Sequence, residues 1–180
     1  MAQYWLSTDK LAAVTKEFNL DNIQTEFQHF LDHQKTVQLA TLDSNNAPDA
    51  SYAPYVKFEN AYYLFLSDLA KHSINLKQNP AISLLFIEDE ATAKNLFARR
   101  RVVLRGRATV INRESSTYAT VMAEFKHCFG GFIDVIEPLQ DFNLFQIAPK
   151  QGRFIRGFAQ AFELSGEGLN QLQHVNPGAS

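Results

Sequence analysis

The feature that most constrains this chain is a series of short apolar runs separated by turn-forming residues. Residues 36–43 are rich in β-branched side chains, residues 61–67 read AYYLFLS, and residues 81–88 form a nearly continuous apolar run. Runs of this length and composition are typical of β-strands. Most of them are joined by short turns instead of helices, which favours antiparallel pairing.

Further strands are expected wherever apolar and polar residues alternate. Pro54 interrupts one of them and indicates an edge or a bulge, because proline cannot donate a ladder hydrogen bond. A turn is predicted at Lys150-Gln151-Gly152, whose residues suit a chain reversal. These further strands are predicted over residues 50–58, 100–111, 142–149 and 153–164.

Helices are predicted where apolar residues recur at helical spacing. The first covers about residues 21–34, the second occupies the segment between 67 and 80, and the third runs from 112 to 130. The whole pattern predicts a mainly β, α+β fold: an antiparallel barrel of six or seven strands with helices at its ends. The predicted N-caps are Asp21, Ser67 and Asn112, and the predicted stops are Pro80 and Gly130-Gly131.

The composition excludes several classes of protein. A net charge of -2 gives no general attraction to nucleic acid or to an anionic membrane. Cys128 is the single cysteine, which excludes an internal disulfide and is typical of a reducing compartment. No apolar run approaches the roughly 20 residues of a spanning helix, and the N-terminus does not read as a signal peptide. We therefore expect a cytoplasmic protein with an N-terminal arm (1–20), one barrel domain (21–165) and a C-terminal tail (166–180).

The polar segment SDLAKHSINLKQNP, between two predicted buried strands, is the first candidate site. A helix start presents unpaired N–H groups and partial positive charge, and so can receive an anion. Ser67 offers a hydroxyl, and Lys71 and His72 add cationic or donor groups. The alternative is a capped amphipathic helix whose lysine is merely solvated.

Other polar clusters indicate less. The arginines between 99 and 107 suit a phosphate site or a subunit boundary better than nucleic acid, because acidic residues 88–90 lie close by and no aromatics interleave with them. His29 and His33 have metal-ligand spacing without an obvious third ligand, so surface histidines are expected.

Several segments in order carry a resemblance to a known family. They are TVQLATLD, SYAPYV, YYLFLSDLAKHSINLKQNPAISLLFIED and RRVVLRGRATV, followed by LQDF and QGRFIRGFAQAFELSG. This series resembles the FMN-binding split barrel of the pyridoxamine 5′-phosphate oxidase superfamily and, within it, the haem-utilisation proteins of the HugZ/HutZ type. The likeness covers about residues 34–170. It implies a homodimer with flavin-type or haem-type sites at the subunit boundary.

For a flavin, the resemblance implies an FMN-dependent oxidoreductase. The phosphate would lie by Ser67, Lys71 and His72, where oxidase members usually have a basic pair, and Asn75 would help to orient the site. The strand facing the flavin ring would include Ser51, Tyr52 and Ala53, with Arg101 near the pocket.

For haem, the resemblance implies binding at the dimer cleft and oxidative degradation that releases iron. A histidine of the C-terminal tail would ligate iron, and Asp141 would orient it. The family's ligand position falls near Ala179, and His174 is the only histidine of the tail. Thr36 and Arg101 fall at further site positions. A third hypothesis is a dimer that has the fold but binds neither cofactor and catalyses no reaction.

Overall fold

The computed structural model describes residues 18–158 and 160–175. Most of the predicted N-terminal arm and the last five residues of the predicted tail, including Ala179, lie outside this range.

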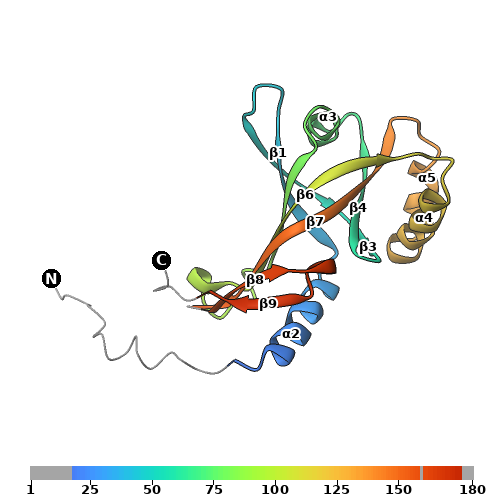
Figure 1. The fold of residues 1–180 in the computed structure, drawn as a ribbon. Coiled ribbons are helices and arrows are strands. Elements are labelled where there is room, and N and C mark those ends of the chain that lie inside the picture. The colour runs from blue at the N-terminus through green and yellow to red at the C-terminus, as the bar shows by residue number, and fades with distance from the viewer. Residues whose placement is uncertain (1–17, 159, 176–180) are drawn as a thin grey trace, which may run out of the picture.

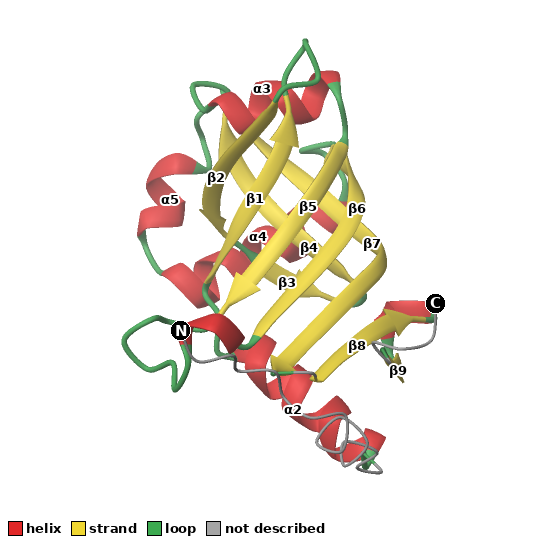
Figure 2. Cartoon of the chain, turned by 90° about the vertical axis from the view of Figure 1, so that its left-hand side faces the viewer, coloured by secondary structure: helices red, strands yellow, loops and turns green. Residues whose placement is uncertain are grey.

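The core of the fold is one nine-stranded sheet whose paired strands are all antiparallel. The order is β2-β1-β5-β6-β7-β4-β3, with β8 added to β7 and β9 added to β8. The sheet coils into an open barrel that does not close (Figure 2). The strands are β1 (Thr36–Leu42), β2 (Pro48–Pro54), β3 (Val56–Phe58), β4 (Ala61–Ser67), β5 (Ala81–Ile87), β6 (Arg101–Ile111), β7 (Phe142–Gly157), β8 (Gln160–Ser165) and β9 (Gln171–His174).

The helices lie around this barrel (Figure 1). The helix α3 packs against β1 and β2 at one end, α4 and α5 lie beside β3, and α2 lies near β8 and β9 at the other end. The class predicted from the sequence is therefore confirmed, with more strands than the six or seven expected. The helices are α2 (Leu20–Asp32), α3 (Lys71–Gln78), α4 (Ser116–Phe129) and α5 (Phe132–Ile136), and short 3₁₀ turns cover Leu96–Ala98 and Glu167–Leu169.

All three predicted N-caps are wrong, and the correct N-cap positions lie two or three residues away. Asn19 caps α2 by accepting from Asn22 N at 3.1 Å. Ser115 caps α4, because its hydroxyl oxygen accepts a hydrogen bond from Tyr118 N, three residues later, at 3.1 Å. Ala70 precedes α3 without any side-chain cap. Composition locates such helix starts only approximately, since Asn, Asp and Ser cluster near each of them.

Two strand predictions also differ from the structure. The segment 50–58 divides after Pro54 into β2 and β3, which pair with different strands, β1 and β4. The predicted turn at 150–152 is absent, and one 16-residue strand, β7, runs through it. Gln151 and Gly152 stay extended because they pair with Arg105 and Leu104 of β6.

The pairing of β6 with β7 contains one irregularity. Arg105 lies opposite Gln151, while the next residue, Gly106, lies opposite Pro149. Lys150 therefore has no partner on β6, as in a β-bulge.

The segment predicted as a tail contributes to the sheet. Residues Gln171–His174 form β9, which pairs antiparallel with β8. Within the described part of the chain, no helix has both the length and the apolar character needed to cross a membrane.

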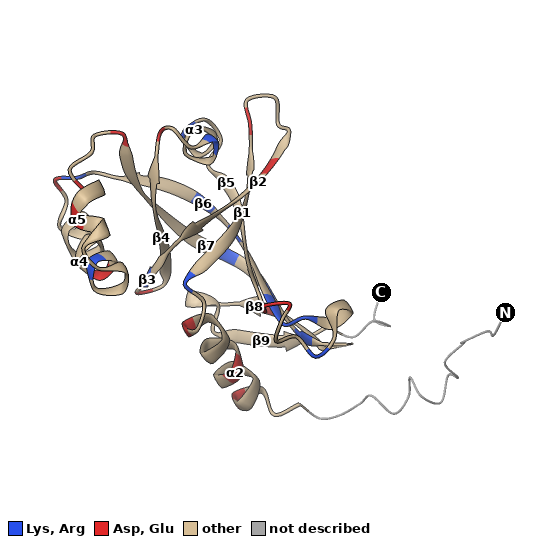
Figure 3. Cartoon of the chain, turned by 180° about the vertical axis from the view of Figure 1, so that it is seen from behind, with Lys and Arg blue, Asp and Glu red and all other residues tan. Residues whose placement is uncertain are grey.

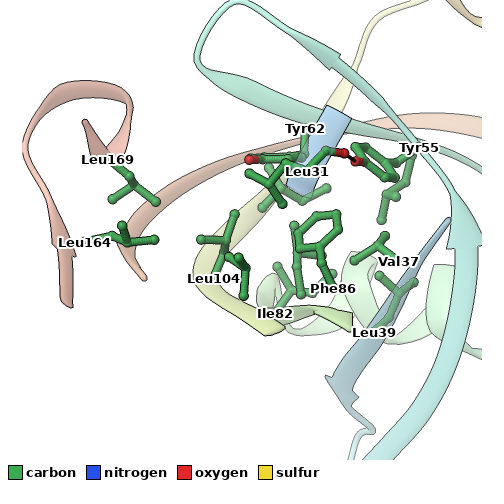
Figure 4. Packing of buried hydrophobic residues seen from close by; sticks show 14 of the residues in the cluster. Leu31, Val37, Leu39, Tyr55, Tyr62, Ile82, Phe86, Leu104, Leu164 and Leu169 are labelled. Carbon is green, nitrogen blue, oxygen red and sulfur yellow. Dashed lines mark hydrogen bonds between the residues drawn. The ribbon is translucent and has the colours of Figure 1, made fainter. Parts of the chain in front are cut away.

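The buried side chains form two clusters on opposite sides of β4. Tyr62, Leu64 and Leu66 point into the barrel, where they join residues of α2 and of most strands. Tyr63 and Phe65 point the other way and pack against α4. This explains the unbroken apolar run of β4, since both of its faces are covered. Figure 4 shows the first cluster around Phe86, where Tyr55 Oη donates to the Leu31 carbonyl at 3.1 Å.

Candidate functional site

Ser67 lies at the end of β4, where its hydroxyl is used within the protein. Ser67 Oγ donates to Asp141 Oδ2 at 2.6 Å and accepts from Leu69 N at 3.1 Å. The backbone of the same turn is tied to Asp141, because Asp68 N donates to its carbonyl at 2.7 Å. The structure thus brings together two residues that the sequence assigned to different roles. As a phosphate ligand Ser67 stays a prediction, and the adjacent carboxylate makes this position less favourable for an anion.

His72 and Ser51 also meet at this end of the barrel. His72 Nδ1 lies 2.9 Å from Ser51 Oγ. Burial lowers the pKa of His72, and the nearby Asp49 carboxylate partly opposes this by raising it. The ring is half-buried and favours the neutral form, so it is better suited to hydrogen bonding than to acting as a cation.

Lys71 and Asn75 have different environments on the same helix. Lys71 is exposed, and its charge helps to lower the pKa of Asp43, after the larger effect of two backbone hydrogen bonds from Ala47 and Asn45. Asn75 is buried and donates to both Thr41 Oγ1 and Asp49 Oδ2 at 3.0 Å. Asn75 therefore fixes α3 against β1 and β2. Lys71 is exposed, and its role as a phosphate ligand stays a prediction.

A wide groove lies on the outer face of the sheet. It has a volume of about 710 Å³ and crosses β2, β1, β5 and β6. Its lining includes the predicted residues Thr36, Ser51 and Tyr52, and Tyr52 is 69% exposed. Ala53 points the other way and is buried in the core. The sequence did not single out the other lining residues, although the alternation of the strands places most of them outward: Gln38, Leu39, Ala40, Ala50, Ser83, Leu85 and Val103.

Arg101 and Asp141 lie at opposite ends of the sheet. Arg101 pairs with Ile155 near the end of β7, whereas Asp141 immediately precedes the start of that strand. At about 3.3 Å per residue, the path along the strand from Asp141 to Ile155 is roughly 45 Å. Within one chain these two predicted site residues do not meet. Arg101 is half-buried, and its Nη1 donates to the Arg99 carbonyl at 3.1 Å.

His174 lies on β9, on the same side of the sheet as the core. It pairs with Phe162 of β8. Its ring centroid lies 4.6 Å from that of Phe18 and 5.2 Å from that of Phe162. In the described residues no three His, Cys, Asp or Glu side chains gather into a metal-binding cluster. The role of His174 as an iron ligand stays a prediction, and the ring would have to leave this aromatic packing to fulfil it.

Comparison with known proteins connects this architecture to one family. Residues 23–156 match the family model described as pyridoxamine 5′-phosphate oxidase. The chain is 40% identical over 156 residues to heme oxygenase HutZ of Vibrio cholerae serotype O1, which covers 87% of this chain and 89% of that protein.

Two solved structures have the same fold. HutZ of Vibrio cholerae, described there as a heme storage protein, superposes with a TM-score of 0.68 and 41% identity over 71% of this chain and 89% of that chain. ChuZ of Campylobacter jejuni gives a TM-score of 0.82 and 31% identity over 92% of this chain and 69% of that chain. The predicted split-barrel type is thereby confirmed. The chain belongs to the pyridoxamine 5′-phosphate oxidase family of split-barrel proteins and, within it, to the HutZ-type group.

Proposed function

We propose that this protein acts in haem utilisation, binding haem in the outer groove of the sheet where two copies of the chain meet. The observation that carries the proposal is the 40% identity, over 87% of the chain, to a heme oxygenase. The proposal extends to oxidative opening of the haem ring with release of iron. A cytoplasmic location belongs to it as well, because the single cysteine suits a reducing compartment.

The groove fits one face of a flat, largely apolar ring. Leu85, Val103 and small residues line the outer face of the strands here, and the exposed ring of Tyr52 stands at the side of the groove. Aromatic and aliphatic side chains are the usual lining of cofactor sites. When bound, haem would supply the redox and oxygen chemistry, while the protein binds and orients it. The groove is open to solvent, so a second surface is needed to exclude water from the other face of the ring.

A second copy of the chain would supply that surface. Arg101 and Asp141 lie at opposite ends of the sheet in one chain. Two copies related by a two-fold axis that runs across the middle of β7 would bring the Arg101 end of one sheet toward the Asp141 end of the other. A homodimer therefore accounts for a site that needs both residues, and neither nucleic acid nor a membrane is part of the proposal.

In this dimer His174 would ligate iron, with Asp141 of the partner subunit accepting its ring N–H. Such a hydrogen bond fixes the imidazole tautomer and strengthens it as a ligand. The hydrogen bond from Ser67 already holds Oδ2 of Asp141 at 2.6 Å. The other carboxylate oxygen then remains for the histidine.

The alternative is an FMN-binding oxidoreductase. The family description and the exposed Lys71 at the start of α3 favour it. The environment of Ser67 argues against it, because an anionic phosphate would lie beside the Asp141 carboxylate. Haem is the better supported ligand for this reason.

Absorbance titration of the purified protein with haem and with FMN tests the proposal. We expect a saturable shift of the haem Soret band with micromolar or tighter affinity. A yellow protein that retains FMN and does not bind haem would favour the alternative. Binding of neither ligand would indicate a dimer without retained chemistry and would overturn both proposals.

The ligand assignment predicts the behaviour of His174→Ala. This variant should lose the Soret shift, because the iron would lose its protein nitrogen ligand. The matched control is His29→Ala on α2, which should keep the shift. A normal Soret shift in His174→Ala would refute the assignment while leaving haem binding itself intact.

A further inference from the structure

A second groove continues the haem groove along the outer face of the sheet. It has a volume of about 410 Å³, and it is lined by Arg105, Arg153 and Glu163, among others, from β6, β7 and β8. Val103 lines both grooves. The two grooves therefore adjoin at this residue, with an apolar part on β1, β2 and β5 and a basic part on β6 and β7. Figure 3 shows basic segments on the strands in the middle of the sheet.

The arginines of this second groove differ from those nearby in their pairing. Arg99 and Arg100 are paired with Glu90 and Glu88, at 2.9 and 2.8 Å. Arg105 is exposed and forms no ion pair with any of the described residues. The groove therefore contains an uncompensated guanidinium.

Arg153 faces the same groove and has one acidic partner. Its Nε donates to Glu163 Oε1 at 2.9 Å. Both side chains are about half exposed, at 53% and 46%. An exposed pair of this kind is weak, so another carboxylate can replace that of Glu163 at little cost. Arg105 and Arg153 lie on adjacent strands, since their partners in the ladder are Gln151 and Val103.

We propose that Arg105 and Arg153 form a carboxylate-binding subsite that holds the acidic side chains of a tetrapyrrole whose ring lies in the adjoining groove. This inference rests on the proposed function. Haem has an apolar ring and two carboxylates on one edge, and the combined grooves have an apolar part beside a basic part. Guanidinium groups bind carboxylates through paired N–H donors, which gives both charge and orientation. The subsite thus orients the ring, with its acidic edge toward β7 and its apolar edge toward β2.

The test compares haem with haem dimethyl ester, in which both carboxylates are esterified. In the full-length protein, Arg105→Gln and Arg153→Gln should each bind haem roughly tenfold more weakly, because each loses a charge-assisted hydrogen bond. Their affinity for the dimethyl ester should equal that of the wild type. Equal losses for both ligands would overturn the inference, since they would indicate a general defect of the groove.

Arg107→Gln is the matched control. Arg107 lies two residues along β6, is exposed, and does not line the second groove. Its substitution should change haem affinity less than twofold. If Arg107→Gln weakens haem binding as much as Arg105→Gln and Arg153→Gln do, the losses reflect the general positive charge of the surface, and the subsite is refuted.

Glu163→Gln provides a variant expected to gain affinity. It removes the carboxylate that competes for Arg153, so haem should bind several-fold more tightly while the dimethyl ester is unaffected. Unchanged or weaker haem binding in this variant would contradict the role of Arg153. If wild-type protein binds neither haem nor its ester, the proposed function fails, and this outcome is distinct from failure of the subsite.

Discussion

Polar residues at the α3 end of the barrel are linked by hydrogen bonds that connect distant parts of the chain. Ser67 and Asp141 are 74 positions apart, and Asn75 and Thr41 are 34 apart. The sequence indicated a polar segment over residues 67–75 beside buried strands, and the structure places this segment between β4 and β5. Its role as a ligand site stays a prediction. The sequence did not indicate which of these groups are already paired, because a side chain's partner depends on the tertiary arrangement.

His72 should make stability depend on pH. Burial lowers its pKa in the folded state, with Asp49 partly opposing this, so below about pH 6.5 the unfolded chain binds more protons. Stability should therefore fall as the pH decreases from 7 toward 5, by at most about 1.4 kcal/mol per pH unit from this group. Urea denaturation at several pH values should show that the free energy of unfolding depends less steeply on pH in His72→Gln than in the wild type.

Ser51→Ala is the informative comparison for this experiment. It removes the hydrogen bond to His72 but keeps the buried ring. Its stability should be lower at every pH, with the dependence on pH retained. If the free energy of unfolding depends equally on pH in His72→Gln and in the wild type, His72 is not the source of the pH dependence.

The long strand β7 joins the two ends of the fold. It pairs with β4 near its start, with β6 along most of its length and with β8 near its end. Gly152 allows this, because a Cβ atom there would lie 2.7 Å from Leu104 Cδ2 and 2.8 Å from Leu164 Cδ1. A residue typical of turns is thus required for close packing between neighbouring strands.

Gly152→Ala should therefore destabilise the protein. Leu104 and Leu164 are buried, so they cannot move away without repacking the core. We expect a loss of about 1–3 kcal/mol in the free energy of unfolding, measured by urea denaturation. Gly157→Ala on the same strand is the control, since its Cβ would meet nothing within 4 Å. Equal effects of the two substitutions would show that the packing at Gly152 is not the cause.

Local patterns predicted the strands well and their connections less well. The strands β1, β4 and β5 lie close to their predicted ranges because each combines β-forming residues with clear turns at its ends. The predicted turn at 150–152 was wrong because Lys and Gly are typical of turns whatever the neighbouring strands do. Here those strands hold the segment extended. β9 was missed because QLQH has too few apolar residues to predict a strand; its pairing with β8 determines it.

The molecule as a whole leaves part of the outer face of its sheet exposed. The inner face is covered by its own side chains and by α2, and α4 covers the outer face over β3 and β4. The outer face of β1, β2, β5 and β6 contains the first groove and the exposed ring of Tyr52, and the second groove lies beside it. A second copy on this face would both bury that ring and complete the proposed site. The fold could be predicted from the sequence, whereas the shared site that the resemblance implies stays a prediction, because one chain does not contain both of its surfaces.

Tyr52→Glu should therefore weaken the proposed homodimer. A charge in the middle of the interface would lose solvation without a partner, which opposes association. Sedimentation equilibrium should show a dimer for the wild type and mostly monomer for this variant. Phe132→Glu is the control, because Phe132 is exposed to the same degree, 68% against 69%, but lies on α5. A monomeric wild type would contradict the proposed assembly.

The unpaired residue Lys150 determines which way half of β7 faces. Before it, Phe145 and Ile147 are buried at odd positions; after it, Gly152 and Phe154 are buried at even positions. One additional residue thus inverts the parity of the strand and keeps both halves pointing into the core. Replacing Lys150 would leave this parity intact, whereas deleting it would turn Phe154 and its neighbours toward water. At this point, the length of the chain matters more than the identity of the residue.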